Sequence, residues 1–340
     1  MQDIASAMGV SVMTVSRALR GVAGVSEKTA LKVRERAIEM GYKPNPMVQT
    51  LMAQVRRGQA TAAANLAWVT TCGPEKQQTN PTIKIQQGAR NQAEKLGYNL
   101  TDFIIEPGMT EDHVRKIFHA RGIRGGVIAP LIRAGAELPL PYSDFAYAAI
   151  GRSLARPALH YTMAHHYHLM EKVVTELTAR GYQRIGFLFS SDMALRVGQA
   201  HLMVFDHFIH GLPKRRVIPS ATYDKWEAGD FAEWADRNAP DACIIDYPFV
   251  WDHIQAAGLM LGGDFGVVAL SWWPSHPHVT GIRHHYKILG SAAVDMVVGQ
   301  LHRNECGVPK ICKATLIEGQ WMEGETLRQP CEKSASTVEG

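Results

Sequence analysis

The chain has 340 residues, too many for one ordinary domain and suited to a small module joined to one large or two medium-sized ones. Hydrophobic residues make up 46% and charged residues 20%, the balance of a soluble globular protein, and no run approaches the ~20 uninterrupted apolar residues that cross a bilayer. The N-terminus has no apolar signal-peptide core, so we expect a cytoplasmic protein with no membrane partner.

Positive charge is concentrated at the N-terminus. Residues 1–58 carry nine Lys or Arg and four Asp or Glu, a net +5, which leaves −1 for the other 282 residues. A basic segment on a near-neutral body indicates a polyanionic partner for that segment alone. The five cysteines are dispersed without a CxxC pair, so we expect reduced thiols rather than a disulfide framework.

The first predicted elements lie in IASAMGVSVMTVSRAL, residues Ile4–Leu19, which holds two short helical patterns with a turn at Gly9. In the second pattern Val12, Val15 and Leu19 share one face. The opposite face carries small polar and cationic side chains of the kind that a major groove accepts: Met13, Thr14, Ser16, Arg17 and Arg20. Paired helices with a glycine turn are common in all-α proteins, so the DNA-binding interpretation also depends on the next two segments of the chain.

These segments are a third helix and a basic linker. Ser26 is a suitable N-cap for the helix and Gly41 a stop signal. Residues 42–59 (YKPNPMVQTLMAQVRRGQ) then contain a short apolar helical stripe that includes Leu51. A helix this short is unstable alone. It therefore needs a partner, which is either its twin in a dimer, a DNA minor groove or the body of the protein.

From Asn65 onward, apolar strands alternate with helices, the pattern of parallel sheets with helices on both faces. The predicted strands are Leu66–Thr71, Asn99–Ile105, Gly126–Pro130, Ala146–Ile150, Arg184–Phe189, Ala242–Ile245 and Gly266–Leu270. The predicted helices are Ile83–Leu96, Glu111–Ala120, His165–Arg180, Ala194–His210, Phe231–Asn238, Phe249–Gly258 and Tyr286–His302. The tail from Pro330 has a disordered composition.

The first 51 residues resemble the DNA-binding headpiece of the lactose-repressor (LacI/GalR) family of bacterial transcription regulators. The resemblance rests on GVSxxTVSRxL, on VSxxT at the start of the third helix and on GYxPNxxxxxL. It is specific in the first 55 residues and weaker in the βα body beyond them. The family usually has a few residues ahead of the first helix, including its cap, so we expect the first helix of this chain to fray.

The resemblance implies an α/β protein with a three-helix helix-turn-helix headpiece, a hinge helix and a two-lobed periplasmic-binding-protein-like domain. The expected domains are 1–44 for DNA binding, 45–60 for the hinge helix and linker, 61–329 for effector binding and dimerisation, and 330–340 for the tail. Lobe 1 would take residues 61–158 and 284–310, and lobe 2 residues 159–283 and 311–329. The expected protein is a repressor that binds a pseudo-palindromic double-stranded operator as a homodimer or tetramer, under allosteric control by a small effector.

Residue by residue, the resemblance places Val12, Met13 and Arg17 at base edges and Leu51 in the minor groove. Phosphate contacts would come from Ser11, Thr14, Ser16, Ser26, Thr29, Tyr42 and Asn45. Arg17 can donate two hydrogen bonds to guanine, whereas Val12 and Met13 offer only apolar contact, for example to thymine methyls. We therefore expect Arg17 to anchor the sequence preference and the apolar pair to tune it.

The effector cleft implied by the resemblance is formed by Thr71, Arg196, Trp226, Asp246, Ser271, Trp272 and His284. Loops at the carboxyl ends of parallel strands are where α/β folds bind ligands. Aromatic faces with one Arg and one Asp suit a carbohydrate. Arg152 and Ser271 stand where the family often has acidic residues, so the identity of the effector does not carry over.

The histidine run at His165, His166 and His168 could indicate a metal site, but no cysteine or paired carboxylate nearby completes a ligand set. We expect neither a metal nor a cofactor. We also expect no enzyme, because GxGxxG after a strand, GxxxxGK[ST], HExxH and GxSxG are all missing. A solute-binding protein would need a signal peptide and no basic headpiece, and an architectural DNA-binding protein would not need an effector body.

Overall fold

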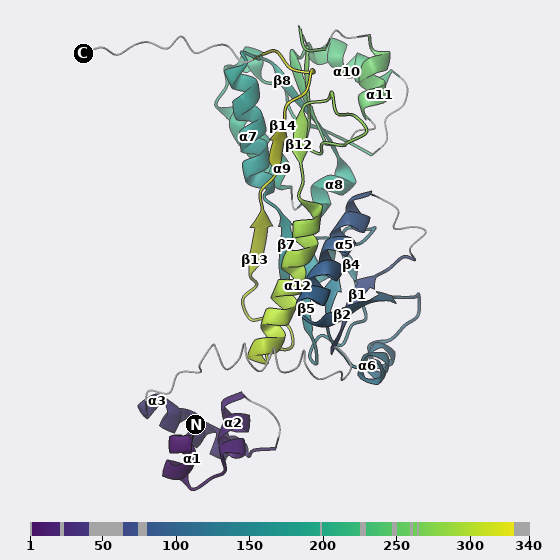
Figure 1. The fold of residues 1–340 in the computed structure, drawn as a ribbon. Helices are drawn as coiled ribbons and strands as arrows, with labels where there is room; N and C mark the ends of the chain where they lie inside the picture. The colour runs from purple at the N-terminus through teal and green to yellow at the C-terminus, as the bar shows by residue number, and fades with distance from the viewer. Residues whose placement is uncertain are drawn as a thin grey trace, which may run out of the picture.

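The computed structural model describes residues 2–20, 24–40, 64–73, 80–197, 199–224, 229–246, 250–258, 261–263 and 265–329 (Figure 1). The predicted hinge helix, with Tyr42, Asn45 and Leu51, lies outside these residues, as does the predicted tail. No helix within the described ranges is both long and apolar enough to cross a membrane.

The N-terminal unit, called the headpiece below, contains α1 (Gln2–Met8), α2 (Val12–Arg20) and α3 (Glu27–Glu39). Its small core is formed by apolar side chains from all three helices: Ile4, Ala5, Val15, Ala18, Val33 and Ala37. Val12 was expected to share the apolar face of α2 with Val15, but it is 43% exposed because it is the first residue of the helix.

The body contains two sheets, each with helices on both faces, which agrees with the predicted α/β class (Figure 1). The first has the order β13-β7-β5-β3-β1-β2. Its strands are β1 (Ala64–Thr70), β2 (Tyr98–Ile104), β3 (Ile123–Ile128), β5 (Ala146–Ile150), β7 (His160–Ala164) and β13 (Ala314–Ile317). All pairings in this sheet are parallel.

The second sheet has the order β14-β12-β11-β10-β8-β9. Its strands are β8 (Ile185–Ser190), β9 (Ala221–Tyr223), β10 (Ala242–Ile245), β11 (Gly266–Ala269), β12 (Gly281–Arg283) and β14 (Gln320–Met322). The edge strand β14 runs antiparallel to β12, and the other pairings are parallel. A separate two-stranded pair joins β4 (Ala136–Glu137) to β6 (Leu154–Arg156).

Helices cover the four sheet faces. On the first sheet, α5 (Asn80–Lys95) and α12 (Tyr286–Arg303) cover one face and α6 (Glu111–Ala120) the other. On the second, α7 (His166–Ala179), α8 (Ser191–Arg196) and α9 (Ala200–His210) cover one face, and α10 (Asp230–Asn238) and α11 (Val250–Ala256) the other. The single helix predicted over Ala194–His210 is therefore two helices, separated near Gln199, whose φ is 60°.

Glycines bring α5 and α12 into close backbone contact. A Cβ on Gly290 would lie 2.8 Å from the backbone nitrogen of Ala89 and closer still to the carbonyl oxygen of Ile85. A Cβ on Gly88 would collide with the backbone of Lys287. The packing of these helices therefore depends on the absence of side chains at both positions.

The chain crosses between the sheets three times: from β7 to α7, from β12 to α12, and from β13 to β14. The lobe boundaries expected at residues 158 and 310 are wrong in detail, because β7 and β13 both belong to the first sheet. These strands are short and pair with each other across a long sequence separation. Local apolar patterning therefore gave no reason to assign them to the first lobe.

Candidate nucleic-acid interface and ligand cleft

The start of α2 presents the residues expected to contact bases. Val12 and Met13 are 43% and 64% exposed, large values for apolar side chains, and Arg17 is also exposed one turn further along the helix. The core residue Val15 holds the opposite face of α2 against α1 and α3. A short helix with one buried face and one exposed face of this composition can enter a groove.

Two serine–threonine pairs cap the helices behind this surface. The Ser11 hydroxyl accepts the backbone N–H of Thr14 at 3.1 Å, and the two hydroxyls lie 2.8 Å apart. Ser26 and Thr29 repeat the arrangement at α3, with distances of 3.2 and 2.7 Å. Each pair lies at a helix N-terminus, where backbone N–H groups and the helix dipole favour an anion. Ser16, the remaining predicted phosphate contact in the described part of the chain, lies within α2.

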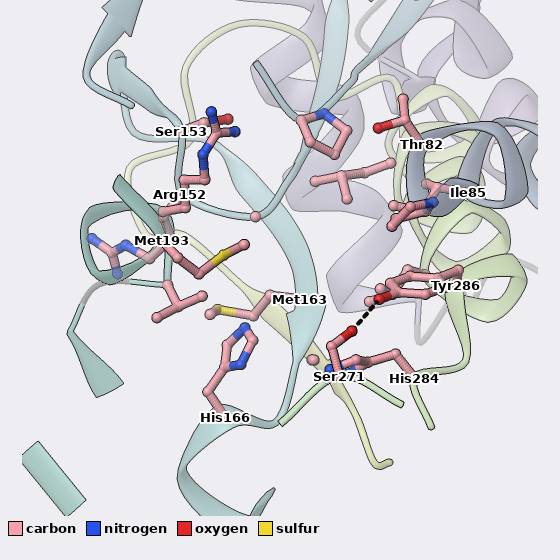
Figure 2. Close-up of a pocket in the computed structure, with 18 of the residues that line it drawn as sticks. Thr82, Ile85, Arg152, Ser153, Met163, His166, Met193, Ser271, His284 and Tyr286 are labelled. Atoms are coloured by element: carbon pink, nitrogen blue, oxygen red, sulfur yellow. Dashed lines mark hydrogen bonds between the residues drawn. The ribbon is translucent and has the colours of Figure 1, made fainter. Parts of the chain in front are cut away.

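A cavity of about 490 Å³ lies between the two lobes and is lined mainly by apolar side chains. Thr82 and Ile85 on α5 contribute from the first lobe, and Met193 contributes from α8 of the second. Figure 2 shows these side chains around the same space, together with residues of the crossovers such as His166 and Tyr286. A largely apolar cavity with a few polar groups is the usual form of a small-molecule site.

Four of the seven residues predicted for the cleft line this cavity: Arg196, Asp246, Ser271 and His284. Thr71 and Trp272 do not line it, because Thr71 is exposed in the bend after β1 and Trp272 lines a separate small cavity next to Trp251. Trp226 lies outside the described residues. The indole that does line the cavity belongs to Trp273.

Two of the charged side chains at the cavity, Arg196 and Asp246, have partners within the protein. Arg196 donates to the Asp192 carboxylate and to the Leu131 carbonyl oxygen, a contact that also joins the two lobes. Asp246 accepts the Ser190 N–H and the Tyr223 hydroxyl, each at 2.6 Å. Burial raises the pKa of Asp246 above its usual range.

Three imidazoles, those of His166, His201 and His284, also line the cavity. His166 Nδ1 lies 3.0 Å from His201 Nε2, so one ring donates to the other. His284 Nε2 donates to the Leu270 carbonyl oxygen at 2.9 Å, which leaves its Nδ1 as an acceptor. His201 is 3% exposed, and its Nδ1 has no hydrogen-bond partner among the described residues.

These imidazoles are neutral near pH 7. Burial lowers the pKa of His166 to about 3 and that of His284 to about 4. Burial also places the pKa of His201 well below its usual value, and the neighbouring imidazoles lower it further. The cavity therefore offers neutral hydrogen-bonding groups on an apolar surface.

Comparisons with known proteins match the N-terminal segment in sequence and the whole chain in fold. Residues 1–45 match the family model for bacterial regulatory proteins of the lacI family. A lac repressor dimer bound to operator and the anti-inducer ONPF has the same fold, with a TM-score of 0.57 at 19% identity over 96% of this chain and 98% of that one. The N-terminal segment therefore belongs to the lacI family, and the whole chain has the fold of the lac repressor.

Three other transcriptional regulators extend the comparison. A CelR–cellobiose complex matches with a TM-score of 0.59 at 18% identity, covering 95% of this chain and 98% of that one. The HTH-type transcriptional regulator GntR of Pseudomonas aeruginosa is 43% identical over 67 residues, and the sucrose operon repressor of Vibrio alginolyticus is 43% identical over 51. The segment shared with GntR spans 20% of this chain and 20% of GntR, and the segment shared with the sucrose operon repressor spans 15% of this chain and 54% of that protein. The likeness in sequence to these two relatives therefore covers only a small part of this chain.

Sequence analysis did not identify His166, His201 and Tyr286 as cleft residues. His166 was considered only within a histidine run, although it lies one residue from His165 and therefore points to a different side of α7. His201 lies within the helix predicted over Ala194–His210 and was not singled out there. Its sequence signal was a polar residue within an otherwise apolar helix face.

Proposed function

We propose that this LacI-family chain is a sequence-specific, DNA-binding transcriptional repressor whose operator affinity depends on a small effector bound between the lobes. One observation carries the proposal: the exposed surface of α2 and the cavity between the lobes occur in the same chain. The named relatives are regulators and repressors, so the proposal assigns no catalytic role.

The DNA partner would be a pseudo-palindromic duplex bound by two headpieces of a homodimer. Arg17 would read guanine, and Val12 and Met13 would contact thymine methyls or other apolar base edges. The capped N-termini of α2 and α3 would lie against phosphates, with Ser11 and Ser26 at their starts. The lac repressor in the complex named above is a dimer on its operator, which supports the same arrangement here.

The effector would be an uncharged, hydroxyl-bearing molecule, and we propose a carbohydrate. Arg196 already pairs with Asp192, the buried Asp246 already accepts two hydrogen bonds, and the three imidazoles carry no charge. A charged ligand would lose its hydration in a mainly apolar cavity, where the ionic partner left to it among the described lining residues is the exposed Arg152. Aromatic lining from Phe189, Trp273 and Tyr286 suits the C–H faces of a sugar ring.

The proposed DNA contact can be tested on a site selected from random sequences with the full chain. Arg17→Ala should weaken binding to the selected site by about 1–3 kcal/mol, or roughly 5- to 150-fold, and have little effect on random DNA. Arg36→Ala provides a matched control, because Arg36 is an exposed headpiece arginine that pairs with Glu39. Equal losses on both DNAs would show that Arg17 contacts only phosphate.

The proposed effector can be tested by measuring resistance to unfolding with sugars and their acidic or phosphorylated counterparts. A ligand at ~100 times its dissociation constant should add ~2.7 kcal/mol to the free energy of unfolding. The uncharged member of each pair should give the larger effect, and the same ligand should change operator affinity. A DNA-binding chain that responds to none of them would be architectural, whereas a ligand-binding chain that selects no DNA would be a solute-binding protein.

A further inference from the structure

Two histidines and a glutamate meet on the outside of the crossover region. His168 Nδ1 lies 3.0 Å from Glu318 Oε1, and the rings of His165 and His168 stack with centroids 3.7 Å apart and planes 7° apart. One donor atom from each of the three side chains lies within 4.8 Å of the other two. Among the described residues, no other three His, Cys, Asp or Glu side chains meet in this way.

The fold, rather than the local sequence, completes this group. The sequence near the histidine run offers no paired carboxylate, and Glu318 is 150 residues from His168. Parallel pairing of β7 with β13 places Ala164 beside Ile317, so His165 and Glu318 leave the sheet together. The backbone N–H of His165 donates to the Ile317 carbonyl oxygen at 2.9 Å, which fixes the two segments relative to each other.

The donor set has a definite chemical preference. Two imidazole nitrogens and one carboxylate oxygen suit a divalent transition-metal cation, whereas Ca²⁺ and Mg²⁺ favour sites built from oxygen alone. His165 is the weaker ligand, because its Nδ1 already accepts the backbone N–H of His168 at 3.3 Å as the N-cap of α7. His168 and Glu318 are exposed and need no rearrangement of the core to bind.

We propose that His165, His168 and Glu318 bind a divalent transition-metal cation such as Zn²⁺, with water completing its coordination. The cation would join the first and third crossovers and so oppose relative motion of the two lobes. This site is separate from the effector cavity, into which the neighbouring His166 points. It does not depend on the proposed DNA-binding function.

The test is titration of the full chain with ZnCl₂, followed by calorimetry and by the thermal unfolding midpoint. Cys306, Cys312 and Cys331 are replaced by serine in every protein to remove competing thiols. His168→Gln and Glu318→Gln keep hydrogen-bonding groups but are poor ligands, and each should weaken binding by at least about tenfold. His165→Ser keeps an N-cap oxygen and should weaken it less.

The control uses a second pair of histidines with the same spacing, His207 and His210 in α9. The double variant His207→Gln/His210→Gln should bind one Zn²⁺ per chain as tightly as the parent. Three results would overturn the proposal: no binding by the parent, unchanged binding in His168→Gln and Glu318→Gln, or loss of binding in the control. In each case the His168–Glu318 contact would be only a surface ion pair.

Discussion

Acid should destabilise the body of this protein at a pH well above the range in which carboxylates titrate. Histidine in an unfolded chain has a pKa near 6.5, while the folded pKa values of His166 and His284 are about 3 and about 4. A lowered folded pKa means that the unfolded chain binds more protons in this window. Stability is therefore fully present above pH ~6.5 and is lost as the pH falls toward the folded values.

The magnitude depends on the difference in bound protons. Between about pH 7.5 and about pH 5, each of these two histidines should lower the free energy of unfolding by roughly 1–2 kcal/mol, or roughly 2–4 kcal/mol for the pair. His160 and His201 act in the same direction, because burial lowers both pKa values. Asp246 opposes them, because its raised pKa lets the folded protein take up a proton as the pH falls.

The assay is urea unfolding between pH 7.5 and 5, followed by tryptophan fluorescence. The first tryptophan in the chain is Trp68, so the signal reports on the body and not on the headpiece. His166→Gln/His284→Gln should reduce the slope of stability against pH by up to ~1.4 kcal/mol per pH unit per histidine. The same substitution at the exposed His207 is the control. An unchanged slope in the double variant would refute the neutral-imidazole interpretation.

Three further predictions concern the hinge, the helix packing and the cleft. Leu51→Ala, in the segment outside the described residues, should weaken operator binding and leave effector binding intact; an unchanged operator affinity in a mobility-shift titration would exclude the minor-groove role. Gly290→Ala should lower the free energy of unfolding in urea by about 3 kcal/mol, because its Cβ would collide with the backbone of α5. Gly299→Ala is the control and should lower it by nothing, because its Cβ would meet only the flexible end of Arg303. Equal effects of the two substitutions would contradict the close-contact argument. Asp246→Asn should lower the free energy of unfolding in urea by about 1–3 kcal/mol, because the new amide N–H₂ faces one of the two groups that donate to Asp246. Adding Tyr223→Phe removes one of those donors and should recover part of the loss. Strictly additive losses would mean that the two side chains do not interact.

The central strands and long helices could be predicted because their burial is visible in local sequence. The bounds predicted for β5 and β10 and for α6 are those of the structure. Strands covered on both faces appear as continuous apolar runs, and α6 has an N-cap threonine, Thr110, followed by two acidic residues. These signals do not depend on distant parts of the chain.

The short crossover strands could not be predicted for the opposite reason. Ala314–Ile317 forms β13 only because β7 provides a parallel partner, and its own burial alternates between exposed and partly buried. In β12, the three residues Gly281–Arg283 are too few to give a periodic signal. The positions of these strands depend on pairing over long sequence separations.

Only part of the candidate cleft could be predicted from the sequence, for a similar reason. Asp246, Ser271 and His284 follow strands at one edge of a sheet, where such sites form, and Arg196 ends the helix α8 that follows β8. His201 lies on a helix, and only the packing of α9 against α7 brings it to His166. A sequence pattern can place a residue on a helix, but it does not show which distant helix lies opposite.

The three crossings between the lobes also determine the order in which the protein can fold during synthesis. The headpiece leaves the ribosome before the body, and its described core residues all lie within residues 4–37. The first sheet begins at Ala64, and α5 covers part of one apolar face, but the part that lies under α12 is not covered until Arg303 has been made. At ~5–20 residues per second this part stays exposed for roughly ten to fifty seconds. A nascent chain with that exposure is a natural client for chaperones, and a ribosome stalled before α12 would release a DNA-binding module attached to an incompletely folded body.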